Sequence, residues 1–353
     1  MDKYRHTFLG LIGKEILKVL CCGFVVADLI VADLPYIPRP SYITWAPMGI
    51  RLRTGGHPTN VSIDLMQMGL SEGDVGVVGV VGYDVFGDFI ESSLRSKGIR
   101  TLLSRVKEAE TSKCIALVVK GEDRRFIAEP GANEYLRVED VEKMIFDHRP
   151  TIFYQASGIL GEYDFKLPHV LNVAKSINSI TILDFVQPYR KSWGYLIPAL
   201  PFTDIIHCND VELRQMTNYE SIEDGVKKIA DLGVKISLIS LGSRGLYAYL
   251  RKSDILIKQD AFKVDVVDPT GAGDALVAGV MYSLLSKINH LNDLDDIEVD
   301  DLIEILAYGQ AAGAACVTGI GATAGVTKNK IEDILRLQGD MIIKNTKVKK
   351  LSK

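Results

Sequence analysis

No stretch of this 353-residue chain reaches the roughly 18 uninterrupted apolar residues that a membrane-spanning helix requires. Lys14, Glu15 and Lys18 interrupt the apolar N-terminal segment, and no small-residue cleavage pattern of a signal peptide follows it. Cysteines are also few: the five are an odd number, and no two of them form a C-x-x-C pair. Neither a disulfide framework nor a thiolate zinc site is therefore expected. These absences predict a cytoplasmic protein with reduced thiols and no membrane partner.

The chain has no excess of positive charge either, since its formal net charge is −4. Proteins that bind nucleic acids usually carry a basic patch for the phosphate backbone, so no nucleic-acid partner is expected. A small molecule is the better candidate for a ligand. Only the C-terminal end is strongly basic, with five lysines in its last ten residues. We interpret residues 339–353 as a basic tail exposed to solvent.

Two common nucleotide-binding motifs are missing. The pattern G-x-x-x-x-G-K-[ST] of P-loop enzymes does not occur. The pattern G-x-G-x-x-G of a dinucleotide-binding domain would follow the first strand, but residues 23–28 read GFVVAD there. The sequence therefore predicts neither a P-loop enzyme nor a nicotinamide-dependent oxidoreductase.

What the chain does have is a regular alternation of short apolar runs with amphipathic stretches. With 47% hydrophobic and 24% charged residues, it fits a globular protein with one large core. The alternation predicts an α/β fold, in which helices cover both faces of a mostly parallel sheet. The expected strands are 19–28, 75–82, 151–157, 180–185, 204–209, 235–240 and 247–250, and the expected helices are 58–68, 84–97, 139–147, 168–177, 220–231 and 275–286.

Two early segments do not follow this alternation. Residues 33–54 hold four of the twelve prolines, and residues 109–129 read as a hairpin that turns near Gly121. We expect these segments to form a small β-sheet that projects from the main domain as a lid; two unrelated surface loops are the alternative. The apolar face of such a sheet favours pairing between subunits, so a homodimer through the lid is expected.

Residues 268–275 read DPTGAGDA and join a strand-like run to an apolar helix. Gly271 and Gly273 let the backbone approach a ligand, and with Ala272 they supply the free amides of a helix start, which bind anions. Asp274 can accept a proton from an attacking hydroxyl during phosphoryl transfer. An ordinary carboxyl pKa of about 3.9 keeps it ionised without any shift. A simple turn, with Asp274 as a favourable charge at a helix start, is the alternative.

The string DPTGAGDALVAGV at 268–280 resembles the second signature of the PfkB family of sugar kinases. In that family the aspartate of G-A-G-D is the catalytic base. Residues 55–62, which read GGHPTNVS and are followed by Gly69 and Gly79, resemble the first signature. Two such matches, in the family's order and separation, identify the chain as a member of the PfkB family.

The resemblance implies a ribokinase-like kinase domain over residues 18–338, built as a three-layer α/β/α sandwich with a small β-sheet lid. It implies an enzyme that transfers the γ-phosphoryl group of Mg-ATP to a hydroxyl group of a sugar or sugar derivative. Asp274 would be the base, and the amides of 271–273 would form the anion hole. Mg²⁺ is then the expected metal, with ATP as co-substrate. Some members also bind K⁺, and Asp268 and Thr270 stand where two of its ligands would lie.

On the acceptor side, Gly55 and Gly56 let the backbone lie against a polyol. Asn60 offers both a donor and an acceptor to vicinal hydroxyl groups. Asp28 follows Gly23 by five residues, which is the spacing of the family's sugar-binding aspartate. These residues are the expected core of the substrate site.

The resemblance also places Asn133 and Gln155 at the substrate. Gln155 stands near the position of a substrate-binding glutamate in ribokinase, and Val26 replaces an asparagine that touches the sugar there. Ribose is therefore not the expected substrate. Residues 185–190 are only loosely similar to a fructokinase motif, so sugars, sugar acids, sugar phosphates and nucleosides all stay open as acceptors.

On the nucleotide side, residues 209–212 resemble the family's N-x-x-E motif, in which Asn209 and Glu212 would organise hydrated Mg²⁺. The segment 240–245 resembles a nucleotide-contacting turn, and 311–315 resembles the helix that bounds the adenine pocket. The ATP-binding residues that this implies are Asn209, Ser240, Gly242, Ser243, Gly245, Ala312 and Gly313.

Two other functions remain as alternatives. A nucleoside kinase needs apolar or aromatic walls for a base, and the expected lid carries such side chains. These are Tyr36, Tyr42, Trp45 and Phe126. A catalytically silent ligand-binding protein of the same fold would have lost the aspartate or the glycines of 271–274, but all of them are present.

Overall fold

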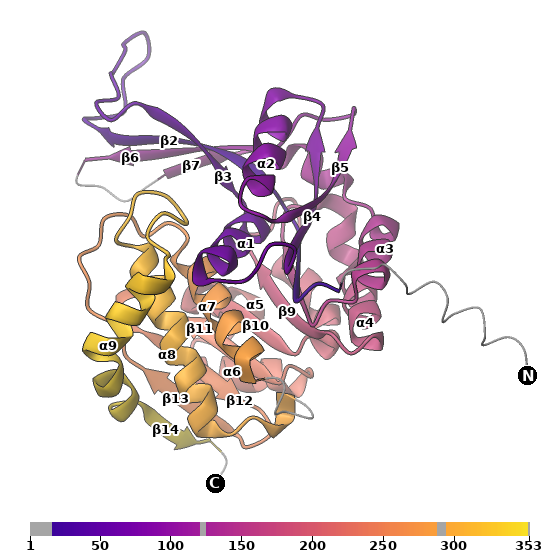
Figure 1. Ribbon diagram of the computed structural model, residues 1–353, viewed down its shortest axis with the longest axis vertical. Helices are drawn as coiled ribbons and strands as arrows, with labels where there is room; N and C mark the ends of the chain where they lie inside the picture. The colour runs from indigo at the N-terminus through magenta and orange to yellow at the C-terminus, as the bar shows by residue number, and fades with distance from the viewer. Residues whose placement is uncertain (1–15, 121–124, 288–293, 352–353) are drawn as a thin grey trace, which may run out of the picture.

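The computed structural model describes residues 16–120, 125–287 and 294–351. The expected hairpin turn near Gly121 lies outside these residues. The described part of the chain contains a ten-stranded sheet and a separate four-stranded sheet, with helices packed on the larger one (Figure 1).

The large sheet has the strand order β14-β13-β12-β11-β10-β9-β8-β1-β4-β5. All neighbours from β11 to β5 pair in parallel, and β12, β13 and β14 add antiparallel strands at one edge. The central parallel strands, such as β4 and β8, are buried along their whole length, which confirms the predicted fold class. The bounds are β1 Val19–Cys22, β4 Val75–Gly82, β5 Arg100–Val106, β8 Ile152–Ser157, β9 Ile180–Phe185, β10 Ile205–Asn209, β11 Ile236–Ser240, β12 Leu246–Leu250, β13 Ile255–Gln259 and β14 Lys347–Lys350.

Two groups of helices cover this sheet. In one group α1, α7, α8 and α9 pack against each other in turn, and the other group contains α3 to α6 (Figure 1). Within the described ranges, no helix has the length and apolar character needed to cross a membrane. The helix bounds are α1 His57–Met68, α2 Val85–Arg95, α3 Val138–His148, α4 Leu167–Ser176, α5 Asp210–Thr217, α6 Ile222–Asp231, α7 Ala272–Lys287, α8 Val299–Cys316 and α9 Lys328–Lys344.

The four-stranded sheet projects from the main domain at the upper left of Figure 1. Its order is β3-β2-β6-β7, with β2 Val26–Leu34, β3 Ile50–Gly55, β6 Lys113–Val119 and β7 Arg125–Ala128. The two segments that broke the sequence alternation therefore do form one small sheet. Its closure as a lid stays a prediction.

The expected single strand 19–28 is two strands in two different sheets. The chain leaves the large sheet after β1 and enters the small one with β2, so the small sheet starts before residue 33. The change of direction occurs at Gly23, which has a positive φ of 143°. A side chain there would lie 2.4 Å from the Ala156 carbonyl oxygen, so only glycine fits.

The expected C-terminal tail is also folded. Helix α9 continues to Lys344, and β14 pairs antiparallel with β13, where Val348 lies opposite Ile257. The basic residues were interpreted as a tail because their composition is that of an exposed segment, and the edge strand that carries them is exposed along its length. Lysines on an edge strand discourage pairing with another chain, so the charge is compatible with the strand.

Candidate active site

Asp274 lies in the first turn of α7 and is almost completely buried, with 6% of its surface exposed. The Asn60 amide donates a hydrogen bond of 2.8 Å to Asp274 Oδ2, and His57 Nδ1 lies 3.6 Å from Asp274 Oδ1. Asn60 and His57 belong to α1, so the fold brings the two sequence signatures together at the starts of two helices.

The expectation that Asp274 keeps an ordinary pKa is not met. Burial raises the pKa of Asp274 above its usual value, because the charged carboxylate loses water. The nearby His57 and the hydrogen bond from Asn60 oppose this rise, whereas the like charge of Asp184 adds to it. The environment of this carboxylate therefore makes it a stronger base than an exposed aspartate.

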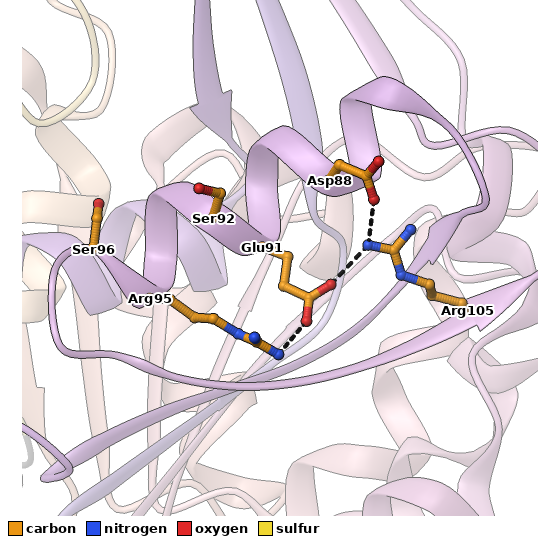
Figure 2. Close-up of a pocket in the computed structure, with 6 residues that line it drawn as sticks. All are labelled: Asp88, Glu91, Ser92, Arg95, Ser96 and Arg105. Atoms are coloured by element: carbon orange, nitrogen blue, oxygen red, sulfur yellow. Dashed lines mark hydrogen bonds and ion pairs between the residues drawn. The ribbon is translucent and has the colours of Figure 1, made fainter.

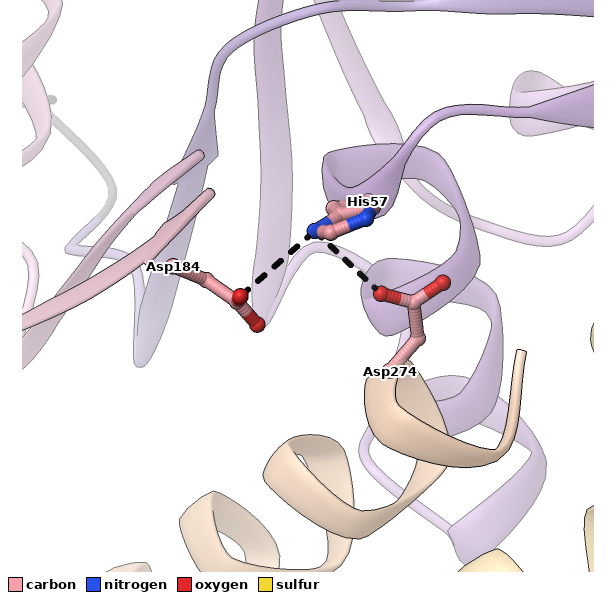
Figure 3. A group of neighbouring side chains, drawn as sticks. All are labelled: His57, Asp184 and Asp274. Atoms are coloured by element: carbon pink, nitrogen blue, oxygen red, sulfur yellow. Dashed lines mark ion pairs between the residues drawn. The ribbon is translucent and has the colours of Figure 1, made fainter. Parts of the chain in front are cut away.

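Three further polar side chains surround Asp274 and were missed by the sequence reasoning. One oxygen of Asp184, at the end of β9, lies 3.7 Å from His57 Nδ1 (Figure 3). Its other oxygen lies 3.0 Å from His207 Nδ1. Burial alone would raise the pKa of Asp184, but the charge and the hydrogen bond of His207, with a smaller effect of the nearby His57, hold it below the usual value. The available signal was a carboxylate and an imidazole inside two apolar strand runs, where polar side chains are rare.

The segment before α7 is held in a tight conformation. Gly271 has a positive φ of 81°, and a side chain there would lie 2.3 Å from the Ala322 carbonyl oxygen. The Ala272 amide makes only a long turn bond, 3.4 Å, to Pro269. A side chain on Gly273 would meet the His207 ring at 3.2 Å. The geometry thus leaves the helix start narrow and lined by backbone, as an anion hole requires.

Asp268 holds this segment to the following loop. One of its oxygens accepts the Thr270 amide and the other accepts the Gly321 amide, each at 2.9 Å. The Thr270 carbonyl oxygen in turn accepts the Cys316 thiol at 3.3 Å. The observed task of Asp268 is therefore to fix the loop, and K⁺ binding by Asp268 and Thr270 stays a prediction.

On the acceptor side, the glycine at position 55 makes room for a carboxylate of the protein itself. A side chain on Gly55 would lie 2.0 Å from Asp28 Oδ2, and one on Gly56 would lie 2.2 Å from the Phe24 carbonyl oxygen. Burial, with the like charge of Asp274, raises the pKa of Asp28 to about 7. The charge of Asp274 is therefore close enough to Asp28 to affect its pKa.

Asn133 and Gln155 are fully buried and bonded within the protein, so their contact with a substrate stays a prediction. The Asn133 amide bonds the backbone N–H and C=O of Val25, each at 3.0 Å. Gln155 accepts from the Tyr163 hydroxyl at 2.8 Å and donates to the Ala156 carbonyl at 2.8 Å. Both amides fix the backbone around the β1–β2 junction and have no exposed surface for a ligand.

The N-x-x-E segment forms a capping box at the start of α5. Asn209 Oδ1 accepts the amides of Val211 and Glu212, and Glu212 Oε2 accepts the Asn209 amide, all at 2.9 Å. Burial raises the pKa of Glu212 above its usual value. The cap uses one carboxylate oxygen, so Glu212 still has a hard oxygen that fits hydrated Mg²⁺.

The expected nucleotide turn lies beside this cap. Ser240 pairs with Asn209 across the parallel strands β10 and β11, so both lie at the same sheet edge. A side chain on Gly242 would meet open space, and Ser243 is exposed. Gly245 is different, because a side chain there would lie 2.0 Å from the Gln259 carbonyl oxygen. Ser240, Gly242 and Ser243 are accessible to a nucleotide, whereas Gly245 is required by the fold.

Ala312 has an observed role in helix packing, and its contact with a nucleotide stays a prediction. It is fully buried in α8 and faces Gly279 of α7, where a side chain would lie 2.9 Å from the Ala312 Cβ. The small side chains let the two helices approach closely. Gly313 lies nearer the site, since a side chain there would lie 3.1 Å from the Ala272 carbonyl oxygen.

A surface hollow of about 570 Å³ lies elsewhere, between α2 and β5 (Figure 2). Its charged side chains are already paired: Arg105 contacts Asp88 and Glu91, each at 2.7 Å, and Arg95 contacts Glu91. None of the residues expected at the site lines it. This hollow is therefore not a candidate for the active site.

Known proteins resemble this chain over most of its length. The sequence model described as pfkB family carbohydrate kinase matches residues 17–329. "Fructokinase-1" of Zea mays is 25% identical over 324 residues, which cover 88% of this chain and 94% of that protein. Aminoimidazole riboside kinase of Salmonella typhimurium is 27% identical over 280 residues, which cover 76% and 83%. The structure of ribokinase from Giardia lamblia shares the fold, with a TM-score of 0.80 and 22% identity, over 92% of this chain and 99% of that one.

The two amide bonds to Asp268 predict a specific stability loss. In Asp268→Asn, one carboxylate oxygen becomes an NH₂ group that faces a backbone N–H, so we expect the free energy of unfolding to fall by about 1–3 kcal/mol. Urea unfolding measures this change, and hydrogen exchange should speed up at Gly321. The control is Asp265→Asn, an exposed aspartate three residues away. Equal stability of the two variants would contradict the bracing role of Asp268.

Proposed function

The chain belongs to the pfkB family of carbohydrate kinases and is an ATP-binding kinase, and from this premise we propose how its site performs the transfer. In this proposal Asp274 is the base, and the amides of residues 271–273 hold the γ-phosphoryl group of Mg-ATP. The acceptor is a hydroxyl group of a sugar or sugar derivative. The single observation that carries the proposal is the hydrogen bond from Asn60 to Asp274, because it places the base between the two signature segments.

The proposed chemical step follows from the Asp274 oxygen that does not bind Asn60. Asn60 occupies Oδ2, so Oδ1 is the oxygen that takes the proton from the acceptor hydroxyl. A bond forms between the acceptor oxygen and the γ-phosphorus as the bond from the γ-phosphorus to the ADP oxygen breaks. The raised pKa of Asp274 suits it to hold this proton.

The amides of 271–273 would bind the charge on the transferring group, since a helix start attracts anions. Glu212 would hold hydrated Mg²⁺ near the phosphates, and this ion would neutralise their charge. Asn209 and Ser240 lie side by side at the same sheet edge, where ATP would lie across the strand ends. The small sheet would close over the acceptor and keep water from competing with it.

A sugar is favoured as the acceptor by the two groups that converge near the base. Asp28 carries a carboxyl group that can bind two hydroxyl groups, and Asn60 offers an amide. A nucleoside is the second candidate, because one relative is a riboside kinase and the small-sheet segments expose aromatic side chains. Of these, Tyr42 is 75% exposed and Trp45 is 76% exposed.

The base role of Asp274 predicts a selective loss of turnover. In Asp274→Asn the amide cannot accept the proton, so kcat should fall by about 10²–10⁴-fold. ATP affinity should change little, because the side chain acts on the acceptor. ADP release is measured with Mg-ATP against ketoses, aldoses, sugar acids, hexose phosphates and nucleosides, and ATP binding is measured by calorimetry. Retained turnover in the variant would reject Asp274 as the base.

The raised pKa of Asp274 predicts the pH profile of the reaction. The base must be ionised, so kcat/KM should fall as the pH drops through a value above the ordinary aspartate pKa of about 3.9. Asn60→Ala removes a hydrogen bond that lowers the pKa of Asp274, and should move this limb further upward. The profile is measured with the best acceptor from the panel. A limb at the ordinary value, or one that moves downward in Asn60→Ala, would contradict the assignment.

A homodimer through the small sheet is the proposed assembly. This part of the chain exposes several large apolar side chains, and such patches mark contact surfaces. They include Tyr42, Ile43, Trp45, Phe126 and Ile127. Sedimentation equilibrium should show a dimer for the wild type and a monomer for the double variant Trp45→Glu, Phe126→Glu. The control is Leu337→Glu, which changes an equally exposed apolar residue on α9. A wild-type monomer would reject this assembly.

A further inference from the structure

His57, Asp184 and Asp274 direct one ligand atom each toward a common point (Figure 3). One nitrogen of His57 and one oxygen of each carboxylate lie within 4.8 Å of one another. His57 Nδ1 is 3.7 Å from Asp184 Oδ1 and 3.6 Å from Asp274 Oδ1. The residues come from the start of α1, the end of β9 and the start of α7, so the tertiary fold alone assembles them.

Each of the two carboxylates is oriented through its other oxygen. Asp184 Oδ2 contacts His207 Nδ1 at 3.0 Å and accepts the Tyr154 hydroxyl at 3.1 Å. Asp274 Oδ2 accepts the Asn60 amide. Outer partners of this kind hold the ligands of metal sites in place, because they fix the direction of the remaining oxygen. Both Oδ1 atoms face His57 Nδ1, and Asp184 Oδ1 also accepts the Phe185 amide at 2.8 Å, which further fixes this carboxylate.

The nitrogen between these oxygens has no hydrogen bond. His57 Nδ1 is buried and has no hydrogen-bond partner among the described residues, because both carboxylate oxygens lie at ion-pair distance but beyond hydrogen-bond distance. The His57 ring is itself held against Phe24, with 5.0 Å between the ring centroids. A buried nitrogen without a partner, facing two buried carboxylates, is a costly arrangement that a bound cation would relieve.

We propose that these three side chains bind one divalent transition-metal ion, with Zn²⁺ as the best fit. Zinc takes nitrogen and carboxylate oxygen ligands at about 2.0–2.2 Å, so neighbouring ligand atoms lie about 3.3–3.5 Å apart in a tetrahedral site. The observed separations from His57 Nδ1 exceed this by only a few tenths of an ångström. The two carboxylate ligand atoms lie within 4.8 Å of each other, so side-chain rotation must bring these together as well.

The donor set selects against the magnesium that accompanies ATP. Mg²⁺ favours an octahedron of oxygen ligands and keeps most of its waters, whereas an imidazole nitrogen suits Zn²⁺, Co²⁺ and similar ions. The His57 side chain is 23% exposed, so an ion can reach the site from the cleft. Three protein ligands leave a fourth position open for water or a hydroxyl group.

Occupancy would have a direct consequence for the proposed kinase reaction. Asp274 Oδ1 is the oxygen assigned to the acceptor proton, and an ion bound there removes it from that role. Zn²⁺ is therefore an inhibitor that acts at the base, and a chelator restores activity. This consequence rests on the proposed function, whereas the binding itself does not.

The binding test uses the full chain after removal of metals, without ATP or acceptor. Co²⁺ is the spectroscopic probe, because its visible absorption reports nitrogen and oxygen ligands, and Zn²⁺ is titrated by calorimetry in the presence of excess Mg²⁺. The wild type should bind one equivalent of each ion. His57→Ala and Asp184→Asn should each lower the affinity by at least about 10–100-fold.

One matched control and one further ligand variant complete the set. His169→Ala removes an exposed histidine that pairs with Glu142, so its affinity should equal that of the wild type. Asp274→Asn removes a ligand by the same isosteric change as Asp184→Asn, and should also weaken binding. Circular dichroism shows whether each variant is folded, and any one folded ligand variant is sufficient for the comparison.

Two results would overturn the proposal. One is the absence of saturable binding by the wild type at neutral pH. The other is equal binding by the wild type and a folded ligand variant. Inhibition by Zn²⁺ is then measured with the best acceptor; if no acceptor is phosphorylated, the proposed function fails while the binding result stands by itself.

Discussion

The hydrogen bond from Asn60 to Asp274 is the contact on which the rest of the site depends. It joins the first turns of α1 and α7, whose bonded residues are 214 positions apart in the sequence. Both side chains are almost completely buried, so the bond forms where water cannot replace it. It fixes one oxygen of Asp274 and leaves the other for chemistry. This hydrogen bond fixes the start of α7, with the proposed anion hole, relative to the acceptor side at the start of α1.

The glycines of the two signatures let neighbouring parts of the protein pack closely against one another at the site. The space of a Gly55 side chain is filled by the Asp28 carboxylate, and that of Gly271 by the backbone at Ala322. From the sequence, these glycines were expected to admit a ligand. The structure shows that they first admit neighbouring parts of the protein, which are then held close to the ligand space. Close approach of backbone is the common physical reason.

Polar residues that look alike in the sequence differ in the structure: some are bonded entirely within the protein, and others keep an atom for a ligand. Asn133 and Gln155 were expected at the substrate, but their amides bind backbone and a tyrosine inside the fold. Asn209 and Glu212 cap a helix, but one carboxylate oxygen of Glu212 takes no part in the cap. A buried amide must find partners, and only the surrounding structure determines whether these are protein or ligand.

The sequence by itself determined the α/β architecture, the two signature segments and the small sheet, because each depends on local patterns of apolar residues, glycines and turns. It did not determine the group formed by His57, Asp184 and His207, or the final strand β14. These depend on which strand ends and helix starts meet, and that is decided by pairing between distant segments. Asp184, at the end of β9, belongs to the site only because β10 and α1 place the imidazoles of His207 and His57 beside it.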